Sequence, residues 1–164
     1  MPLPIRSTND LQTKNWKTIA IVDGLEITGN AGTIIRSADG AGLDGLVFIK
    51  RKVRLTHPKV LHASQGACFS MPIFDGSREE VFKVLDKIKA NIFLGDSKAN
   101  SFFHQKTYPA PCAIVLGSEK KGINTDWYQL DHKIIKIPML GSCNSLNVAC
   151  AATLLFYQTI KPSI

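Results

Sequence analysis

The sequence contains no pair of cysteines spaced as C-x-x-C. Its four cysteines (Cys68, Cys112, Cys143 and Cys150) lie among apolar or small residues, and its four histidines lack the spacing of metal ligands. Neither a zinc site nor a disulfide framework is therefore indicated. We expect reduced, structural thiols, no metal, and a location in the cytoplasm.

A long apolar segment is also missing. The N-terminal stretch MPLPIRSTND has no apolar core of a signal peptide, and no apolar run reaches the roughly 18 residues that a membrane span requires. Internal repeats and low-complexity stretches are absent as well. The 164 residues fit one domain that can bury a core, and we expect no association with a membrane.

What the sequence has in excess is positive charge. Lys and Arg number 20 against 13 Asp and Glu, which gives a formal charge of +7 and a pI near 9.3. This excess favours an anionic partner such as nucleic acid, with solubility alone as the alternative. The segment KRKVR predicts contacts with the phosphates of a nucleic acid, or else forms a solvated face; its basic residues are Lys50, Arg51, Lys52 and Arg54.

Short β-rich runs alternate with helical patterns along the chain. Several of the runs are continuously apolar, as in a parallel sheet that is covered on both faces. Strands are predicted at 17–22, 45–50, 71–74, 91–96, 112–117 and 133–138, and helices at 30–41, 58–67, 78–90, 125–130 and 146–160. This order predicts an α/β domain with a mostly parallel sheet and helices on both faces.

Two local features refine this prediction. Ser77 and Glu80 form a capping-box pattern that predicts the start of the helix at 78–90, whereas residues 1–16 have the pattern of a loose leader. In parallel sheets, ligands bind beyond the carboxyl ends of the strands. The loops that follow Val22, Leu116 and Ile137 are therefore the candidate binding loops.

The segment GAGLDG, residues 40–45, matches the dinucleotide fingerprint G-x-G-x-x-G. That fingerprint binds a pyrophosphate only where its glycines follow a strand and open a helix. Here a helical pattern precedes Gly40 and a strand pattern follows Gly45. We interpret the glycines as a helix stop and a turn, not as a nicotinamide site.

The segment GSCNSLNVACAATLLFYQ, residues 141–158, is unusual because small polar residues lead directly into a helix with almost no polar face. Such a helix is normally buried, and its polar start suggests a bound group. Two other loops share this character. One contains Asn30 and Arg36; taken without the other motifs, these residues would be interpreted as a helix N-cap and an arginine whose stem packs on apolar surface. In the other, glycines flank Ser118 and Glu119; taken by itself, this loop would be interpreted as a plain turn.

Together, the segments NAGTIIRSADGAG, LGSEKKGI and IPMLGSCNSLNVACAA resemble, in order and spacing, the three motifs of the SpoU (TrmH) branch of the SPOUT RNA methyltransferases. Within that branch, VDGLEITGNAGTI and HASQGACFSMPI are most similar to the thiostrepton-resistance ribosomal RNA methyltransferases. The resemblance covers roughly residues 17–160. This chain departs from the family at two positions. Many relatives have an acidic residue where this chain has Asn144, and a serine is common where it has Ala149.

The resemblance implies a deep trefoil knot at the C-terminal end, with S-adenosylmethionine bent among the knot loops. It implies a homodimer through the knot and the helix at 146–160. Residues 17–164 would be the catalytic domain, and the N-terminal RNA-binding domain of many relatives would be absent. The polar residues before the last helix would then line the cofactor site.

The resemblance also assigns residues. Those expected to bind the cofactor are Leu94, Gly95, Leu116, Gly117, Ser118, Ile137, Met139, Ser145, Leu146 and Asn147. Those expected to order the site and the reacting group are Asn30, Glu119, Ser145 and Asn147. Arg36 would be the catalytic arginine, acting beside the cofactor of the partner subunit and contacting RNA.

The implied reaction is methyl transfer to a ribose 2′-hydroxyl of RNA, with ribosomal RNA favoured over transfer RNA. Two alternatives stay open: a knotted protein that binds RNA or the ribosome without turnover, and a methyltransferase that acts on a base. A pure binding protein needs no catalytic set, and this argues against the first alternative, because the chain has the whole set together: Asn30, Arg36, Glu119, Ser145 and Asn147.

Overall fold

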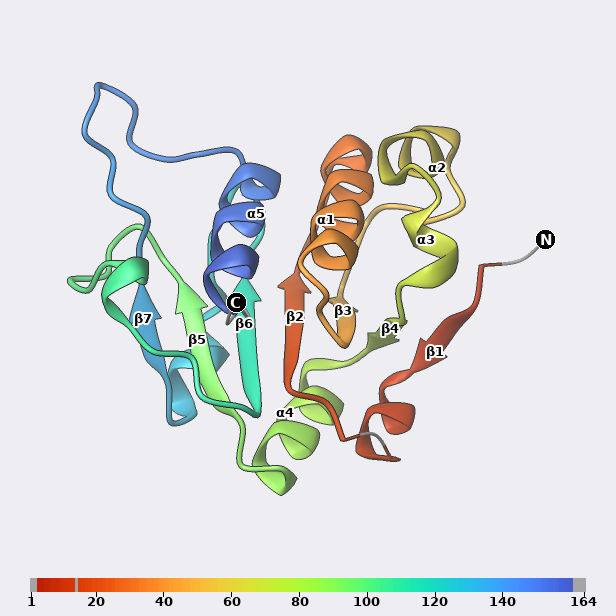
Figure 1. Ribbon diagram of the computed structural model, residues 1–164, viewed down its shortest axis with the longest axis horizontal. Coiled ribbons are helices and arrows are strands. Elements are labelled where there is room, and N and C mark those ends of the chain that lie inside the picture. Colours follow the sequence, from red (N-terminus) through yellow and green to blue (C-terminus); the bar gives the residue numbers. More distant parts are fainter. Residues whose placement is uncertain (1–2, 14, 161–164) are drawn as a thin grey trace.

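The computed structural model describes residues 3–13 and 15–160, and within them one seven-stranded, entirely parallel sheet (Figure 1). The fold is of the α/β class, as the alternation of strand and helix patterns in the sequence predicts. From one edge to the other its strands are β1 (Ile5–Ser7), β4 (Ile73–Gly76), β3 (Gly45–Ile49), β2 (Thr18–Asp23), β6 (Cys112–Leu116), β5 (Asn91–Gly95) and β7 (Lys133–Ile135).

Helices cover both faces of the sheet. One face carries α1 (Thr28–Gly40), α2 (Pro58–Ser64), α3 (Ala67–Ser70) and α5 (Val148–Gln158); the other carries α4 (Arg78–Lys87) and the 3₁₀ helices η1 (Thr8–Thr13) and η3 (Thr125–Gln129). Successive side chains of β2 point to opposite faces of the sheet, so Ala20 packs in the core on the α1 side and Ile21 in the core on the α4 side. A third 3₁₀ turn, η2 (Phe103–Gln105), lies in the β5–β6 connection.

The six predicted strands are confirmed, with the last one shortened at its carboxyl end. The helix predicted at 58–67 is divided, since Gln65 and Gly66 adopt positive φ angles of 51° and 88° between α2 and α3. The predicted capping box at Ser77 and Glu80 is confirmed. The segment at 125–130 forms a 3₁₀ helix and not an α-helix.

The prediction of a loose leader over residues 1–16 is wrong for the part that the structure describes. β1 pairs with β4 in parallel register, Ile5 opposite Ile73, and Leu11 in η1 is 1% exposed. A strand of three residues is too short for a recognisable alternation, which explains the error. Residues 1–2, 14 and 161–164 of the predicted leader and catalytic domain lie outside the described residues.

The order of the strands in the sheet predicts where a ligand-binding crevice lies. From β2 the chain adds β3 and β4 on one side, and later β5, β6 and β7 on the other, so the direction of growth reverses between β2 and β6. Parallel α/β sheets bind ligands beyond the carboxyl ends of the strands at such a point. The helix α5 packs against both β6 and α1 and so begins beside this crevice (Figure 1).

In the described ranges, none of the helices has the length and apolar character needed to cross a membrane.

Candidate functional site

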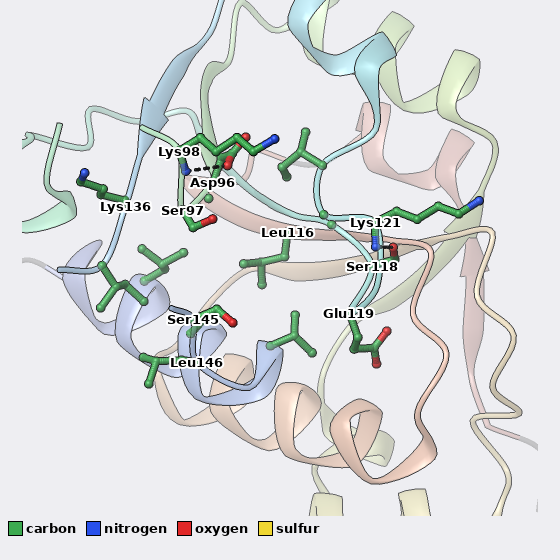
Figure 2. A pocket seen from close by; sticks show the side chains of 18 of the residues that line it. Asp96, Ser97, Lys98, Leu116, Ser118, Glu119, Lys121, Lys136, Ser145 and Leu146 are labelled. Carbon is green, nitrogen blue, oxygen red and sulfur yellow. Dashed lines mark hydrogen bonds between the residues drawn. The ribbon is translucent and has the colours of Figure 1, made fainter. Parts of the chain in front are cut away.

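A pocket of about 970 Å³ opens beyond the carboxyl ends of β5, β6 and β7, next to the start of α5 (Figure 2). It contains residues from all three motif segments. Asn30 comes from the first motif, Ser118 and Glu119 from the second, and Ser145 from the third. Segments that are far apart in the sequence therefore share one cavity.

A chain of three side chains connects these segments. Nδ2 of Asn30 donates to Oε1 of Glu119 at 3.0 Å, and Nδ2 of Asn147 donates to Oδ1 of Asn30 at 3.1 Å. Each link joins residues about ninety or more positions apart. The position of each motif at the pocket is therefore coupled to the other two.

The same side chains complete the starts of two helices. Oδ1 of Asn147 accepts from the backbone N–H of Ala149 at 2.8 Å and caps α5. The N-cap of α1, Ile27, has no capping side chain, and Glu119 instead accepts from the N–H groups of Glu26 and Ile27 at 3.1 and 3.2 Å. Interpreting Asn30 as the N-cap of α1 is wrong, because it lies inside the first turn.

Glycine is required where the second motif leaves β6. A Cβ atom on Gly117 would lie 2.0 Å from the carbonyl carbon and oxygen of Gly122, so any larger residue would displace the loop. The loop is closed by reciprocal backbone hydrogen bonds between Ser118 and Gly122, at 2.9 and 3.1 Å. This tight loop fixes Glu119 at the pocket.

The structure brings nearly all of the residues expected to bind a cofactor to the pocket wall. Leu94 is the exception: it is 0% exposed and packs in the core on the α4 side of the sheet. The residues that do line the pocket are Gly95, Leu116, Gly117, Ser118, Ile137, Met139, Ser145, Leu146 and Asn147.

Arg36 does not line the pocket. It lies on an exposed position of α1, six residues after Asn30, which is about 9 Å along a helix. Within the described residues its side chain has no hydrogen bond or ion pair. Its guanidinium is therefore free, but it does not reach the pocket of its own chain.

The predicted basic run divides into two kinds of residue. Arg51 is held by Asp75 through its Nε at 2.8 Å, and Lys52 pairs with Glu26 at 2.7 Å. The Lys52 contact also lowers the pKa of the Glu26 carboxyl. Lys50 and Arg54 are exposed. Sequence alone cannot separate these cases, because the acidic partners are distant in the chain.

One end of the pocket is formed by residues outside the site predicted from the sequence: Asp96, Ser97, Lys98, Tyr128 and Lys136. Figure 2 shows Asp96, Ser97 and Lys98 at the opposite end from Ser118 and Glu119. The signal that was available is the position of Asp96 directly after β5, at the ligand-binding edge of the sheet. In the described part of the chain, no group of three or more His, Cys, Asp or Glu side chains is arranged to hold a metal ion.

Comparison with known proteins decides the family. The model of the SpoU rRNA methylase family matches residues 17–157. The chain belongs to this family. A Staphylococcus aureus protein assigned to the TrmH family of tRNA/rRNA methyltransferases is 35% identical to this SpoU family chain over 153 residues, which is 92% of the chain and 61% of that protein. The chain thus spans about three fifths of the length of its curated relatives.

Two solved structures extend this likeness. The SpoU methyltransferase AviRb of Streptomyces viridochromogenes, in complex with AdoMet, superposes with a TM-score of 0.85 at 28% identity, covering 97% of this SpoU family chain and 64% of AviRb. An RNA 2′-O ribose methyltransferase superposes with a TM-score of 0.79 at 31% identity, over 86% of this chain and 54% of that one. The parallel α/β fold is therefore that of SpoU methyltransferases.

Proposed function

We propose that this chain binds S-adenosylmethionine and, in the cytoplasm, transfers its methyl group to a ribose 2′-hydroxyl of RNA. The observation that carries the proposal is the chain of hydrogen bonds from Glu119 through Asn30 to Asn147 at the edge of the pocket. The likeness to an RNA 2′-O ribose methyltransferase supports the type of reaction. The likeness to AviRb with AdoMet supports the cofactor.

The pocket fits an adenosyl cofactor in size and lining. Its volume of about 970 Å³ lies within the usual range of small-molecule sites, roughly 300 to 1,000 Å³. Leu116, Ile137 and Leu146 offer apolar contact to a flat adenine, and Gly117 allows close approach of the backbone. When bound, the cofactor supplies a methyl group that is already activated on a sulfonium.

The residues of the chain then have to position the acceptor. Ser145 lines the pocket, and in the described part of the chain its hydroxyl makes no hydrogen bond, so it is available to the reacting groups. Asn30 is hydrogen-bonded to both Asn147 and Glu119. These bonds fix the wall of the pocket beside Ser145. Holding a hydroxyl in line with an activated methyl supplies much of the rate gain in such a transfer.

Arg36 acts at the site of a second copy of the chain. It is exposed and unpaired among the described residues, and it lies outside its own pocket. A guanidinium is a poor base in water but binds a phosphate with two parallel hydrogen bonds. We therefore assign Arg36 to orienting the RNA phosphate and stabilising the emerging alkoxide of the ribose.

The second copy docks on α5. Leu154 and Tyr157 on this helix are 42% and 51% exposed, and Ile160 just after it is 37% exposed. Each large apolar side chain left in water forgoes about 1.5 to 3 kcal/mol of burial. Because α5 packs on α1, a dimer formed through α5 also brings Arg36 to the interface.

The deep trefoil knot belongs to the same proposal. After β7, residues 136–147 carry the chain back to α5, which packs on β6, on α1 and on η2 of the β5–β6 connection. The last helix thus packs against elements from three earlier parts of the chain. Packing of this kind supports the proposal that the C-terminal segment threads through an earlier loop.

RNA reaches the site over exposed basic side chains. Arg51 and Lys52 are engaged by acidic partners, so the contacts with RNA fall to Lys50, Arg54 and Arg36. Phosphate contacts of this kind position RNA without reading its sequence. Ribosomal RNA is the substrate that we favour, in line with the description of the family.

The cofactor step is tested by calorimetry with S-adenosylhomocysteine. Binding with a measurable thermal shift supports the proposal, and methyl transfer from labelled S-adenosylmethionine to RNA then tests the reaction. No heat and no thermal shift at millimolar S-adenosylhomocysteine would overturn the proposal.

A further inference from the structure

One carboxylate of the pocket lies apart from the hydrogen bonds that connect the three motifs. Asp96 directly follows β5 and lines the end of the pocket opposite Glu119 (Figure 2). These two are the acidic residues that line the pocket in the described part of the chain. Glu119 already accepts from Glu26, Ile27 and Asn30, so Asp96 is the carboxylate with the larger free acceptor capacity.

Asp96 is held in place from both sides. Its backbone N–H donates to the carbonyl of Ile135 at 3.0 Å, and its Oδ1 accepts from the N–H of Lys98 at 2.8 Å. Its Oδ2 accepts a hydrogen bond from the hydroxyl of Tyr128. Two carboxylate oxygens offer about four acceptor sites, and two of them remain open.

Tyr128 keeps its proton at neutral pH. Burial, followed by the hydrogen bond to Asp96, raises the pKa of this phenol to about 12. The hydroxyl therefore stays a donor, and Asp96 stays the acceptor. A carboxylate that already receives two hydrogen bonds is oriented before any ligand arrives.

The 3₁₀ helix η3, which carries Tyr128, is itself fixed through the side chains of Asp126 and Trp127. Asp126 accepts from Nη1 of Arg78 at 2.6 Å, and Nε1 of Trp127 donates to Oδ2 of Asp23 at 2.8 Å. Arg78 and Asp23 are 7% and 5% exposed and pair at 2.7 Å. The wall of the pocket at Tyr128 is thus anchored to the end of β2 and to the start of α4.

We propose that Asp96 binds the ribose hydroxyls of the adenosyl group, an inference that rests on the proposed function. The ribose carries the two neighbouring hydroxyl donors of that group, and a fixed carboxylate with two open acceptor sites matches them. The cofactor has two other donors: the exocyclic amino group of adenine, a ring assigned above to the apolar wall of the pocket, and the ammonium of the methionine part. Lys98 and Lys136 line the same end of the pocket and disfavour a further cation, such as that ammonium, there.

The test uses calorimetry with three probes: S-adenosylhomocysteine, 5′-methylthioadenosine, which lacks the amino acid part, and the 2′,3′-dideoxy form of 5′-methylthioadenosine. We expect the wild-type chain to bind 5′-methylthioadenosine about tenfold to a hundredfold more tightly than its dideoxy form, because hydrogen bonds to a charged group are lost. In Asp96→Ala, both forms should bind alike.

Two further variants make the test decisive. Asp96→Asn keeps the size of the side chain and an acceptor for Lys98, so it settles the question if Asp96→Ala fails to fold; it should lose most of the preference for the ribose. Lys98→Ala changes the neighbouring side chain and leaves the backbone donor, so it should keep the full preference.

The inference is overturned if folded Asp96→Ala or Asp96→Asn still prefers the ribose form as strongly as the wild-type chain. It is also overturned if these variants lose affinity for S-adenosylhomocysteine but not for 5′-methylthioadenosine, which would place the contact on the amino acid part. A wild-type chain that binds none of the probes overturns the proposed function and this inference with it.

Discussion

The side-chain amide of Asn147 donates a 3.1 Å hydrogen bond to Asn30, a residue 117 positions earlier in the chain. The side-chain amide of Asn30 in turn donates a 3.0 Å hydrogen bond to Glu119. The start of α5, the first turn of α1 and the loop after β6 are thereby tied together at the pocket. We expect that breaking one link disturbs the pocket more than it disturbs the fold.

Asn147→Asp separates these two effects. Aspartate still caps α5 as well as asparagine does, but it cannot donate to Asn30. We expect a melting temperature near that of the wild-type chain and an affinity for S-adenosylhomocysteine about tenfold lower, because a partly buried acceptor loses its donor. Asn144→Asp adds the same charge nearby without breaking the link and should bind normally. Normal binding by Asn147→Asp would contradict the coupling.

Arg36→Ala tests the catalytic assignment against a structural role. The variant should fold and bind S-adenosylhomocysteine normally, because Arg36 is exposed and outside the pocket of its own chain. Methyl transfer should fall about a hundredfold to a thousandfold, as for loss of one transition-state donor. Arg36→Lys should rescue poorly, since an ammonium cannot form a two-pronged contact. Near wild-type transfer by a folded Arg36→Ala protein would end the assignment.

Leu154→Asp tests the dimer. The wild-type chain should show twice the monomer mass of 18.0 kDa by light scattering at micromolar concentration. A charge at Leu154, 42% exposed on α5, should split the dimer. Phe69→Asp is the matched control, because Phe69 is 46% exposed on α3 and should leave the mass unchanged. A monomeric wild-type protein would refute the interface.

The basic run predicts two different kinds of mutant. Arg54→Ala should weaken RNA binding and reduce its salt dependence by about one unit of slope, because one exposed phosphate contact is lost. Arg51→Ala should mainly lower the melting temperature, because it leaves Asp75 without its partner. Filter binding at several salt concentrations and a melting curve for each variant distinguish the two. Equal salt slopes for Arg54→Ala and wild type would contradict the assignment.

The alternating pattern of strands and helices was sufficient to predict the layers of the fold, because apolar runs such as CAIVLG are buried on both faces of the sheet. β1 could not be predicted in this way, since three residues at a sheet edge carry almost no periodic signal. Its pairing with β4 depends on contacts far along the chain.

The site, like the fold, has a part that could be predicted from the sequence and a part that could not. Asn30, Glu119 and Asn147 lie in motifs that could be recognised one by one, although their hydrogen bonds could not. The pair of Asp96 and Tyr128 has no motif, since it joins the end of β5 to a 3₁₀ helix 32 positions later. Arg51 is predicted by its sequence to contact RNA phosphates or to lie on a solvated face, and only the folded chain brings Asp75 to it.

The chemical nature of the methylated product tests the central claim most directly. After incubation with total RNA and labelled S-adenosylmethionine, the RNA is hydrolysed with alkali, which requires a free 2′-hydroxyl to cleave the chain. The account predicts that the label appears in alkali-resistant dinucleotides, and that Arg36→Ala removes it. Label in mononucleotides would show methylation of a base, and no label from a chain that binds S-adenosylhomocysteine would show a binding protein without turnover; either result contradicts the account.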